Sequence, residues 1–131
     1  MSVSRSGAVM AAAVAVLVLG GCASAQDADV RDVAVDFLDT GLAPDVRCDL
    51  LAPATREALE SEASAPCLDV IGELPLDGGA VRSVEVWGGN AQVRLGGDTV
   101  FLTETSTGWR VVAAACEPRG EAPYECQVEG P

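Results

Sequence analysis

Residues 84–116, VEVWGGNAQVRLGGDTVFLTETSTGWRVVAAAC, carry the pattern that decides the fold. Apolar and polar residues alternate in short runs, and a period of two is typical of a strand with one buried face. Gly-rich and polar segments separate the runs, where glycine and asparagine supply the positive φ of tight hairpin turns. The stretch predicts an antiparallel meander of about four strands, over residues 83–86, 91–95, 100–103 and 109–116.

The segment after the fourth strand is predicted to be irregular. Residues 117–123 contain two prolines and a glycine, which favour a loop. Residues 124–128 are expected to return as a short extension against the fourth strand, where a bridge between cysteines would hold them.

The segment before the meander has helical periodicity. Helices are expected over residues 29–40, 45–51, 53–62 and 67–74, with glycine and proline near the ends where helices start and stop. The first of them has one apolar face, formed by Val30, Val33, Ala34, Phe37 and Leu38. Helices followed by a meander predict an α+β domain over residues 29–131, in which the N-terminal helices pack on one face of a curved antiparallel sheet.

The N-terminus has the three parts of an export signal. Arg5 precedes an apolar run over residues 8–19, and small residues follow it. The exit at residues 19–22, Leu-Gly-Gly-Cys, resembles the lipobox of bacterial lipoproteins, whose pattern is a Leu, a small residue, a Gly or Ala, and then Cys. In that family the cysteine thiol receives a diacylglycerol and becomes the N-terminus after cleavage, so the resemblance assigns lipidation to Cys22.

This resemblance divides the chain into three parts. Residues 1–21 are the expected lipoprotein signal peptide, residues 22–28 a lipidated tether and residues 29–131 the domain. The expected location is the outer, extracytoplasmic face of a bacterial cell membrane, held by the lipid on Cys22. A cleaved export signal that leaves Cys22 unmodified is the alternative. A spanning anchor is disfavoured, because the apolar run has about 12 residues and a membrane helix needs about 20.

The charge balance and the missing residue types exclude several classes of function. The chain has 20 Asp and Glu, eight Arg, no Lys and no His. Once residues 1–21 are removed, seven Arg and all 20 acids remain, which gives a net charge of −13. Such a surface repels nucleic acid, and the missing His and Lys remove the commonest general base and Schiff-base chemistry. We therefore expect no nucleic-acid partner, no cofactor and no metal.

The four remaining cysteines, Cys48, Cys67, Cys116 and Cys126, are expected to form disulfides. An even number of cysteines in a small exported domain is typical of disulfide bonds. Three connectivities are possible, and proximity in the sequence favours Cys48–Cys67 and Cys116–Cys126. Four thiolates can also hold zinc, but the chain contains no C-x₂-C knuckle.

Two motifs resemble a known superfamily. Residues 48–56, CDLLAPATR, and residues 108–111, GWRV, with a following Cys116 and a Tyr-x-Cys end at residues 124–126, are similar to those of small bacterial lipoproteins with a nuclear-transport-factor-2-like domain. The resemblance covers about residues 29–129. It implies the cone-shaped α+β fold of that superfamily, with a pocket between helices and sheet. Enzymatic members place Asp, His or Tyr in this pocket, and this chain offers no matching catalytic position.

Three side chains are candidates for contact with a ligand or partner. Trp87 and Trp109 could line a pocket, although aromatic residues in a small sheet more often belong to the core. Arg56 follows a helix start, where an anion could bind. Its alternative, which we favour, is a solvated Arg near Glu57 and Glu60.

Two functions fit these features. The first is a membrane-anchored lipoprotein that acts as a non-catalytic binding or scaffold module for an envelope protein or a small apolar ligand. The second is a minimal isomerase or hydrolase that uses carboxylates inside the cone. Because the chain has no His and the domain is small, we expect the first function and no enzyme activity.

Overall fold

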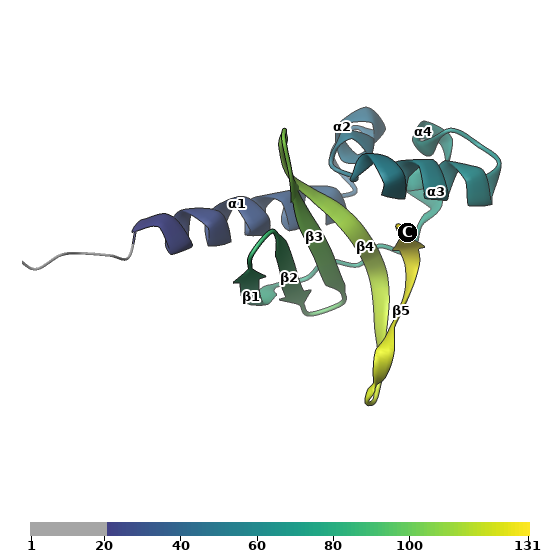
Figure 1. The fold of residues 1–131 in the computed structure, drawn as a ribbon. Coiled ribbons are helices and arrows are strands. Elements are labelled where there is room, and N and C mark those ends of the chain that lie inside the picture. The colour runs from purple at the N-terminus through teal and green to yellow at the C-terminus, as the bar shows by residue number, and fades with distance from the viewer. Residues whose placement is uncertain (1–20) are drawn as a thin grey trace, which may run out of the picture.

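The computed structural model describes residues 21–131 and has an α+β fold (Figure 1). Its helical elements are α1 (Gly21–Leu38), α2 (Pro44–Asp49), α3 (Pro53–Ala63), α4 (Cys67–Val70) and the 3₁₀ turn η1 (Ile71–Glu73). Its strands are β1 (Val81–Trp87), β2 (Asn90–Leu95), β3 (Thr99–Thr105), β4 (Gly108–Arg119) and β5 (Ala122–Glu129). The strands pair antiparallel in the order β1-β2-β3-β4-β5. The predicted α+β meander is confirmed, with five strands rather than about four.

The first helix begins earlier than its apolar face predicts. The expected signal peptide lies outside the described residues except for Gly21, and so does the side chain of Cys22. Residues 22–28, expected as a tether, are helical and continuous with the rest of α1. Residues 23–28 contain three alanines and no glycine or proline, so the helix can extend back through them at little cost.

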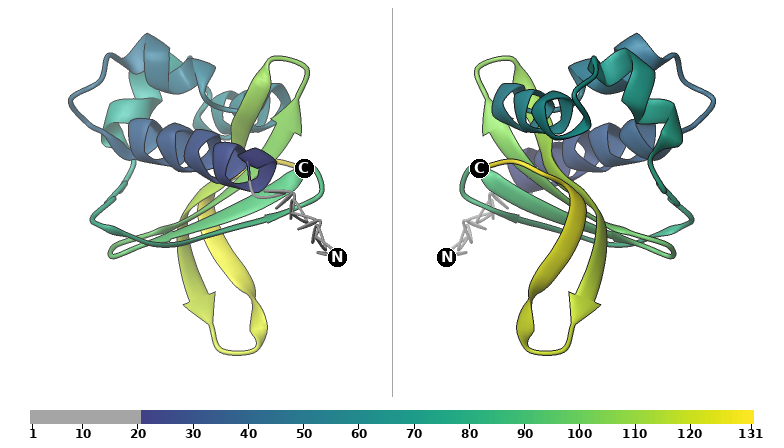
Figure 2. Two further views of the ribbon diagram at one scale, coloured as in Figure 1. Left: turned by 90° about the vertical axis from the view of Figure 1, so that its left-hand side faces the viewer. Right: turned by 90° about the vertical axis from the view of Figure 1, so that its right-hand side faces the viewer.

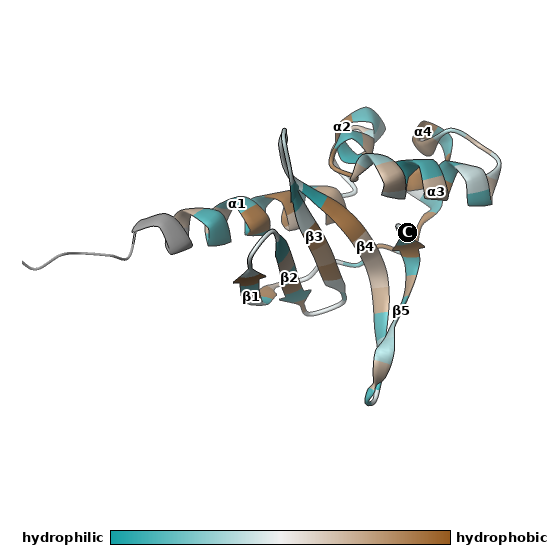
Figure 3. Ribbon diagram, viewed as in Figure 1, coloured by the Kyte–Doolittle hydropathy of each residue, from teal (hydrophilic) through white to brown (hydrophobic). Residues whose placement is uncertain are grey.

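One side of α1 covers the sheet. Its buried residues Val30, Ala34, Phe37 and Leu38 recur at helical spacing. This side contacts β1, β2, β3 and β4, and Figure 2 shows α1 lying across the strands. Apolar and polar segments alternate along α1 in Figure 3, as expected for a helix with one buried side.

The other three helices, α2, α3 and α4, lie beside the end of α1 and are called the helical group below (Figure 1). A proline occupies the first turn of α2 and of α3, where its missing N–H removes no intrahelical hydrogen bond. α3 ends at Ser64, which has a left-handed φ of 53°. The Cys48–Cys67 disulfide then joins α2 to α4, with 6.1 Å between the two Cα atoms.

The helix-facing side of the sheet supplies the rest of the core. In β2 and β3 alternate apolar residues are buried there, as the period of two predicts, whereas β1 contributes half-buried residues. In β2 and β3, Ala91 lies opposite Leu102, and Val93 lies opposite Val100. Further core residues come from β4 and β5, namely Trp109, Val111, Ala114 and Val128.

The segment predicted as a loop over residues 117–123 is instead part of a long hairpin. β4 continues to Arg119, and β5 starts at Ala122, so only a two-residue turn separates them. Gly120 takes a φ of 63° in this turn. The prolines do not break the hairpin, because Pro118 lies at a register shift and Pro123 lies on the edge strand. The Cys116–Cys126 disulfide links directly opposed residues of the two strands.

Candidate functional site

A groove of about 1160 Å³ lies between α3, the segment of α4 and η1, and the β4–β5 hairpin. Its two walls come from parts of the chain that are far apart in the sequence. The hairpin that forms one wall runs away from the helices (Figure 1). The groove therefore lies between helices and the β4–β5 end of the sheet, and the lining residues come from α3 and the segment after it rather than from α1.

The corner of the groove forms where α3 and β5 both meet β4. Leu51, just before α3, makes a parallel bridge with Val111 of β4. The Ala52 N–H donates to the Val111 carbonyl at 2.9 Å. The Gly130 N–H, just after β5, donates to the Val112 carbonyl at 2.9 Å. Consecutive residues of β4 thus hold the start of α3 and the end of β5 side by side.

Gly130 is required at this corner because α3 lies directly against it. A Cβ atom at this position would collide with Oγ1 of the buried Thr55. Beyond the contact, the hairpin diverges from the helices (Figure 1). The close approach at one end and the divergence at the other give the groove its open form.

Acidic side chains line the groove together with apolar ones. Leu59, Val70 and Leu74 are its largest apolar residues. None of the lining residues is basic, so the groove attracts cations. Its carboxylates are those of Glu57 and Glu62 on α3, Glu117 on β4, and Glu125 and Glu129 on β5.

Two of these carboxylates face each other across the hairpin. Glu117 and Glu125 are directly opposite in register, and like charges in that position destabilise a strand pair. Arg119 offsets part of the repulsion, because its Nη1 lies 3.2 Å from Oε2 of Glu125. Both side chains are largely exposed, so this ion pair stabilises little. A cation bound in the groove would reduce the remaining repulsion.

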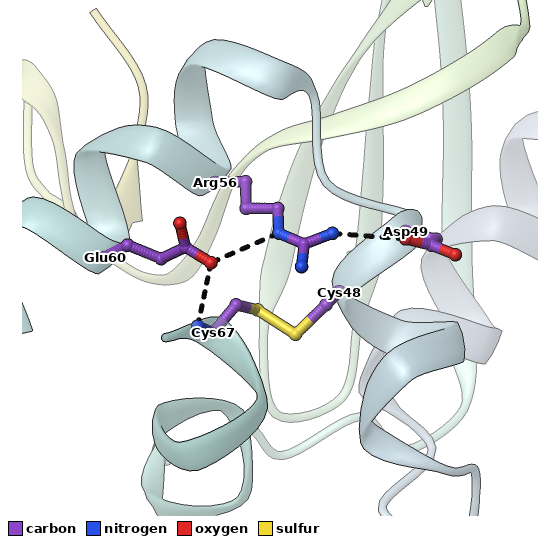
Figure 4. Close-up of polar contacts among 5 residues, drawn as sticks. All are labelled: Cys48, Asp49, Arg56, Glu60 and Cys67. Atoms are coloured by element: carbon purple, nitrogen blue, oxygen red, sulfur yellow. Dashed lines mark hydrogen bonds and ion pairs between the residues drawn. A yellow bond between two sulfur atoms is a disulfide. The ribbon is translucent and has the colours of Figure 1, made fainter. Parts of the chain in front are cut away.

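Arg56, a candidate contact from the sequence, is engaged within the helical group (Figure 4). Its Nε lies 3.3 Å from Oε1 of Glu60, and its Nη1 lies 3.2 Å from Oδ1 of Asp49. The same Glu60 oxygen accepts the Cys67 N–H at 2.9 Å. The Cys67 N–H first, and Arg56 second, lower the pKa of Glu60. Arg56 therefore lies near Glu60, as expected, but it is ion-paired rather than simply solvated, and these contacts lie beside the Cys48–Cys67 disulfide.

The two tryptophans have different environments, and neither lines the groove. Trp109 is 5 % exposed and belongs to the core. Trp87 is 50 % exposed at the end of β1, so a core position is wrong for this residue. The period of two explains the difference. Val84 and Val86 pair with core residues of β2, which turns Trp87 to the opposite face.

A buried carboxylate, Asp98, lies outside the groove and holds the base of the hairpin. It is 6 % exposed. Its Oδ1 accepts the N–H of Thr99 at 2.7 Å and of Cys116 at 2.9 Å, and its Oδ2 accepts the N–H of Ala115 at 2.9 Å. Burial raises the pKa of Asp98, although the three N–H groups act in the opposite direction. Ala115 has a left-handed φ of 53°, so Asp98 stabilises an irregular point of β4.

The four core cysteines form the two disulfides that proximity favours, Cys48–Cys67 and Cys116–Cys126. Their sulfurs are therefore not free to hold zinc as four thiolates. Within residues 21–131, no cluster of three or more His, Cys, Asp or Glu has the arrangement of a metal site.

Sequence reasoning missed the five glutamates of the groove. Their acidity was visible, but they lie in two segments about 60 residues apart. Only the docking of α3 and β5 on β4 brings them together. One local signal was present, since Glu125 and Glu129 are four positions apart and so share one face of a strand.

No family model, curated protein or solved structure matches this chain. The resemblance to lipoproteins with a nuclear-transport-factor-2-like domain therefore stays a prediction from the motifs. In the part of the chain that the structure describes, no helix has both the length and the apolar character required to cross a membrane.

Proposed function

We propose that this protein is a lipid-anchored, non-catalytic binding module at the extracytoplasmic face of a bacterial membrane, whose groove binds a basic segment of an envelope protein. The observation that carries the proposal is the composition of the groove. Five glutamates and no basic residue line it, next to a wall of Leu59, Val70 and Leu74. Carboxylates attract and orient a cationic segment, and apolar contacts add affinity that salt does not screen.

The overall charge supports the same kind of partner. The chain from Cys22 onward has a net charge of −13, which speeds encounter with basic surfaces and opposes encounter with acidic ones. The lipobox-like exit at residues 19–22 supports attachment to the membrane through Cys22. A module held there meets partners that are themselves in the envelope.

The chemistry of the acidic groups supports binding rather than catalysis. A carboxylate acting as a general acid or base is usually one whose pKa is shifted inside a cleft. Asp98 has a raised pKa, but both its oxygens accept backbone N–H groups and it does not line the groove. This arrangement favours a structural role for the residue.

The groove is tested with two variants of equal charge. One replaces Glu57, Glu62, Glu117 and Glu129 by Gln. The control replaces four exposed acids outside the groove, Asp29→Asn, Asp36→Asn, Glu85→Gln and Glu104→Gln. Binding of a fluorescent Lys- and Leu-containing peptide is measured by anisotropy at physiological salt.

We expect the groove variant to weaken binding about tenfold, because each exposed charge pair contributes about 0.2–1 kcal/mol. The control variant should stay within about twofold of the wild type, since its charges lie outside the groove. Equal weakening in both variants would show that net charge alone attracts the peptide, and would contradict the proposed site. Turnover of ester or isomerase substrates that a single Asp or Glu replacement abolishes would contradict the non-catalytic role.

The anchor is tested by metabolic labelling with a palmitate analogue. The wild-type chain should be labelled and should remain with the membrane fraction. Cys22→Ala should be unlabelled, because its side chain offers no thiol for acylation. Cys22→Ser is a second variant of similar size that also lacks the thiol. Equal labelling of the wild type and both variants would rule out lipidation at Cys22.

A further inference from the structure

The outer edge of β5 borders the acidic groove, and α3 lies against the chain at its end, at Gly130. Within the described residues 21–131, β5 is the last strand in the sheet order and pairs only with β4. Figure 2 (right) shows it at the border of the sheet, with no other strand along its outer side. Residues 124–129 contain no proline, so every one of them has a backbone N–H. An open edge of this kind can accept an added strand.

The charges on this edge disfavour a second copy of the chain as the added strand. Glu125 and Glu129 lie on the same face of β5, because they are four residues apart. A second copy paired edge to edge about Gln127 would set Glu125 of one molecule opposite Glu129 of the other. Like charges directly opposite each other destabilise such a pair. The edge is therefore suited to a strand of the opposite charge.

The same two carboxylates set a spacing for that strand. Glu125 and Glu129 both line the groove. They are about 13 Å apart along an extended strand. A bound strand in register with β5 has two side chains opposite them, also four residues apart and on one face. Arg or Lys at these positions would pair with both glutamates.

The edge is held in place before any partner binds. The Cys116–Cys126 disulfide joins β5 to β4, and Asp98 fixes the backbone of β4 at Ala115 and Cys116. At its end, β5 is tied to β4 by the hydrogen bond from Gly130 to Val112. A rigid edge loses little conformational entropy when a strand is added, which favours binding.

We infer that the groove takes its basic partner as an added β-strand on the outer edge of β5, with two cationic side chains four residues apart opposite Glu125 and Glu129. This inference rests on the proposed function and specifies the form of its ligand. Backbone hydrogen bonds to β5 supply affinity that does not depend on the partner's sequence, and the two cation–carboxylate pairs supply selectivity.

The first test varies the spacing of charge in a synthetic peptide. The probe is a short Thr/Val peptide with two lysines four positions apart. The control has the same composition with the lysines three positions apart, which puts them on opposite faces of a strand. We expect the probe to bind the full chain at least about fivefold more tightly. A Glu125→Lys/Glu129→Lys variant should reverse the preference, and bind the peptide in which both lysines are replaced by glutamate.

The second test examines the backbone of the bound peptide. N-methyl groups are placed on alternate amides of the probe, in two complementary sets. Only alternate amides of an added strand point at β5. We therefore expect one set to weaken binding at least about tenfold, and the other set to have little effect. The amides of β5 should also gain protection from hydrogen exchange when the probe binds.

The outcomes separate this inference from the proposed function. If both N-methylated sets bind like the probe, while the Glu57/Glu62/Glu117/Glu129 variant still weakens binding, strand addition is wrong and the acidic groove stands. If no basic peptide binds, the proposed site itself fails. If the chain without peptide sediments as a dimer that protects the β5 amides, a second copy occupies the edge and the inference is overturned.

Discussion

In both the helical group and the β4–β5 hairpin, a disulfide lies beside a carboxylate that accepts the N–H of one of its cysteines. The two regions differ in how far that carboxylate is buried. In the helical group, Glu60 accepts the N–H of Cys67 at the surface, next to Arg56. In the hairpin, Asp98 accepts the N–H of Cys116 while buried. The pKa is lowered for Glu60 and raised for Asp98.

The difference shows how burial changes the role of one contact. Solvated Glu60 loses little hydration, so its contacts with a cation and an N–H favour the ionised form. Buried Asp98 loses hydration, which disfavours the charge, yet three N–H groups depend on its oxygens. The hydrogen bond from Cys67 to Glu60 therefore adds to helices that are already close together in the sequence. The hydrogen bonds to Asp98 are required, because they fix β4, which forms part of one wall of the groove.

The largest expected effect is the loss of the Asp98 carboxylate. Asp98→Ala leaves three backbone N–H groups without their acceptor, and each buried unsatisfied donor costs about 1–3 kcal/mol. We expect the free energy of unfolding to fall by about 4 kcal/mol, measured by urea denaturation. Glu60→Gln is the matched variant in the helical group, and it should cost much less because Gln keeps an acceptor oxygen. Equal losses in the two variants would remove the distinction between the regions.

Removing a disulfide gives the next largest loss of stability. Chain entropy predicts which of the two disulfides contributes more, so their removal also compares the two regions. Cys48–Cys67 spans 19 residues in sequence and Cys116–Cys126 spans 10. Loop closure then contributes about 3.3 kcal/mol for the first and about 2.8 kcal/mol for the second. The two double Cys→Ala variants should therefore lose stability in that order, by urea denaturation. A clearly larger loss for the hairpin would indicate that its disulfide also supports the Asp98 contact in the native state.

The smallest effect is a pH dependence of opposite sign in the two regions. Because the folded pKa of Asp98 is raised, the extra stability that comes from protonating Asp98 is present below the ordinary Asp pKa of about 3.9 and is lost as pH rises through the folded value, while its hydrogen bonds to the three N–H groups remain. Because the folded pKa of Glu60 is lowered, its contribution is present above the ordinary Glu pKa of about 4.3 and is lost as pH falls through the folded value.

Comparing each variant with the wild type separates the pH dependence of stability due to Asp98 or Glu60 from that due to the other carboxylates. The unfolding free energy of the wild type minus that of Asp98→Asn should decrease as pH rises above about 4. The unfolding free energy of the wild type minus that of Glu60→Gln should decrease as pH falls below about 4. Urea denaturation at a series of pH values measures both. Slopes of the same sign would mean that burial does not distinguish the two carboxylates.

Local pattern predicted the fold where the buried face of an element is set by its own periodicity. Val30, Ala34 and Phe37 recur at helical spacing, and they are the buried side of α1. Gly-rich segments placed the first two hairpin turns correctly, and in the first of them Gly88 takes the positive φ of 59° that such a turn favours. The prediction failed at residues 117–123, where two prolines suggested a loop. An edge strand and a register shift tolerate proline, and neither can be recognised without the neighbouring strand.

The candidate site was less predictable than the fold. Arg56 and its neighbour Glu60 lie one helical turn apart, so their pairing could be foreseen from spacing. The exposure of Trp87 could also be foreseen, from its phase with Val84 and Val86. The groove could not, because its position depends on the contact between Thr55 and Gly130, which are 75 residues apart in the sequence.

The sequence by itself determined the α+β class, the faces of α1 and of the strands, and a preference for the two disulfides that close short loops. These features follow from periodicity and proximity, which act within a few residues of each position. Only the tertiary structure decided that Asp98 holds Ala115 and Cys116, that Arg47 is buried with its Nε on the Phe37 carbonyl, and that five glutamates share one groove. Each of these depends on a contact between distant segments, and such contacts form only when the whole core is packed.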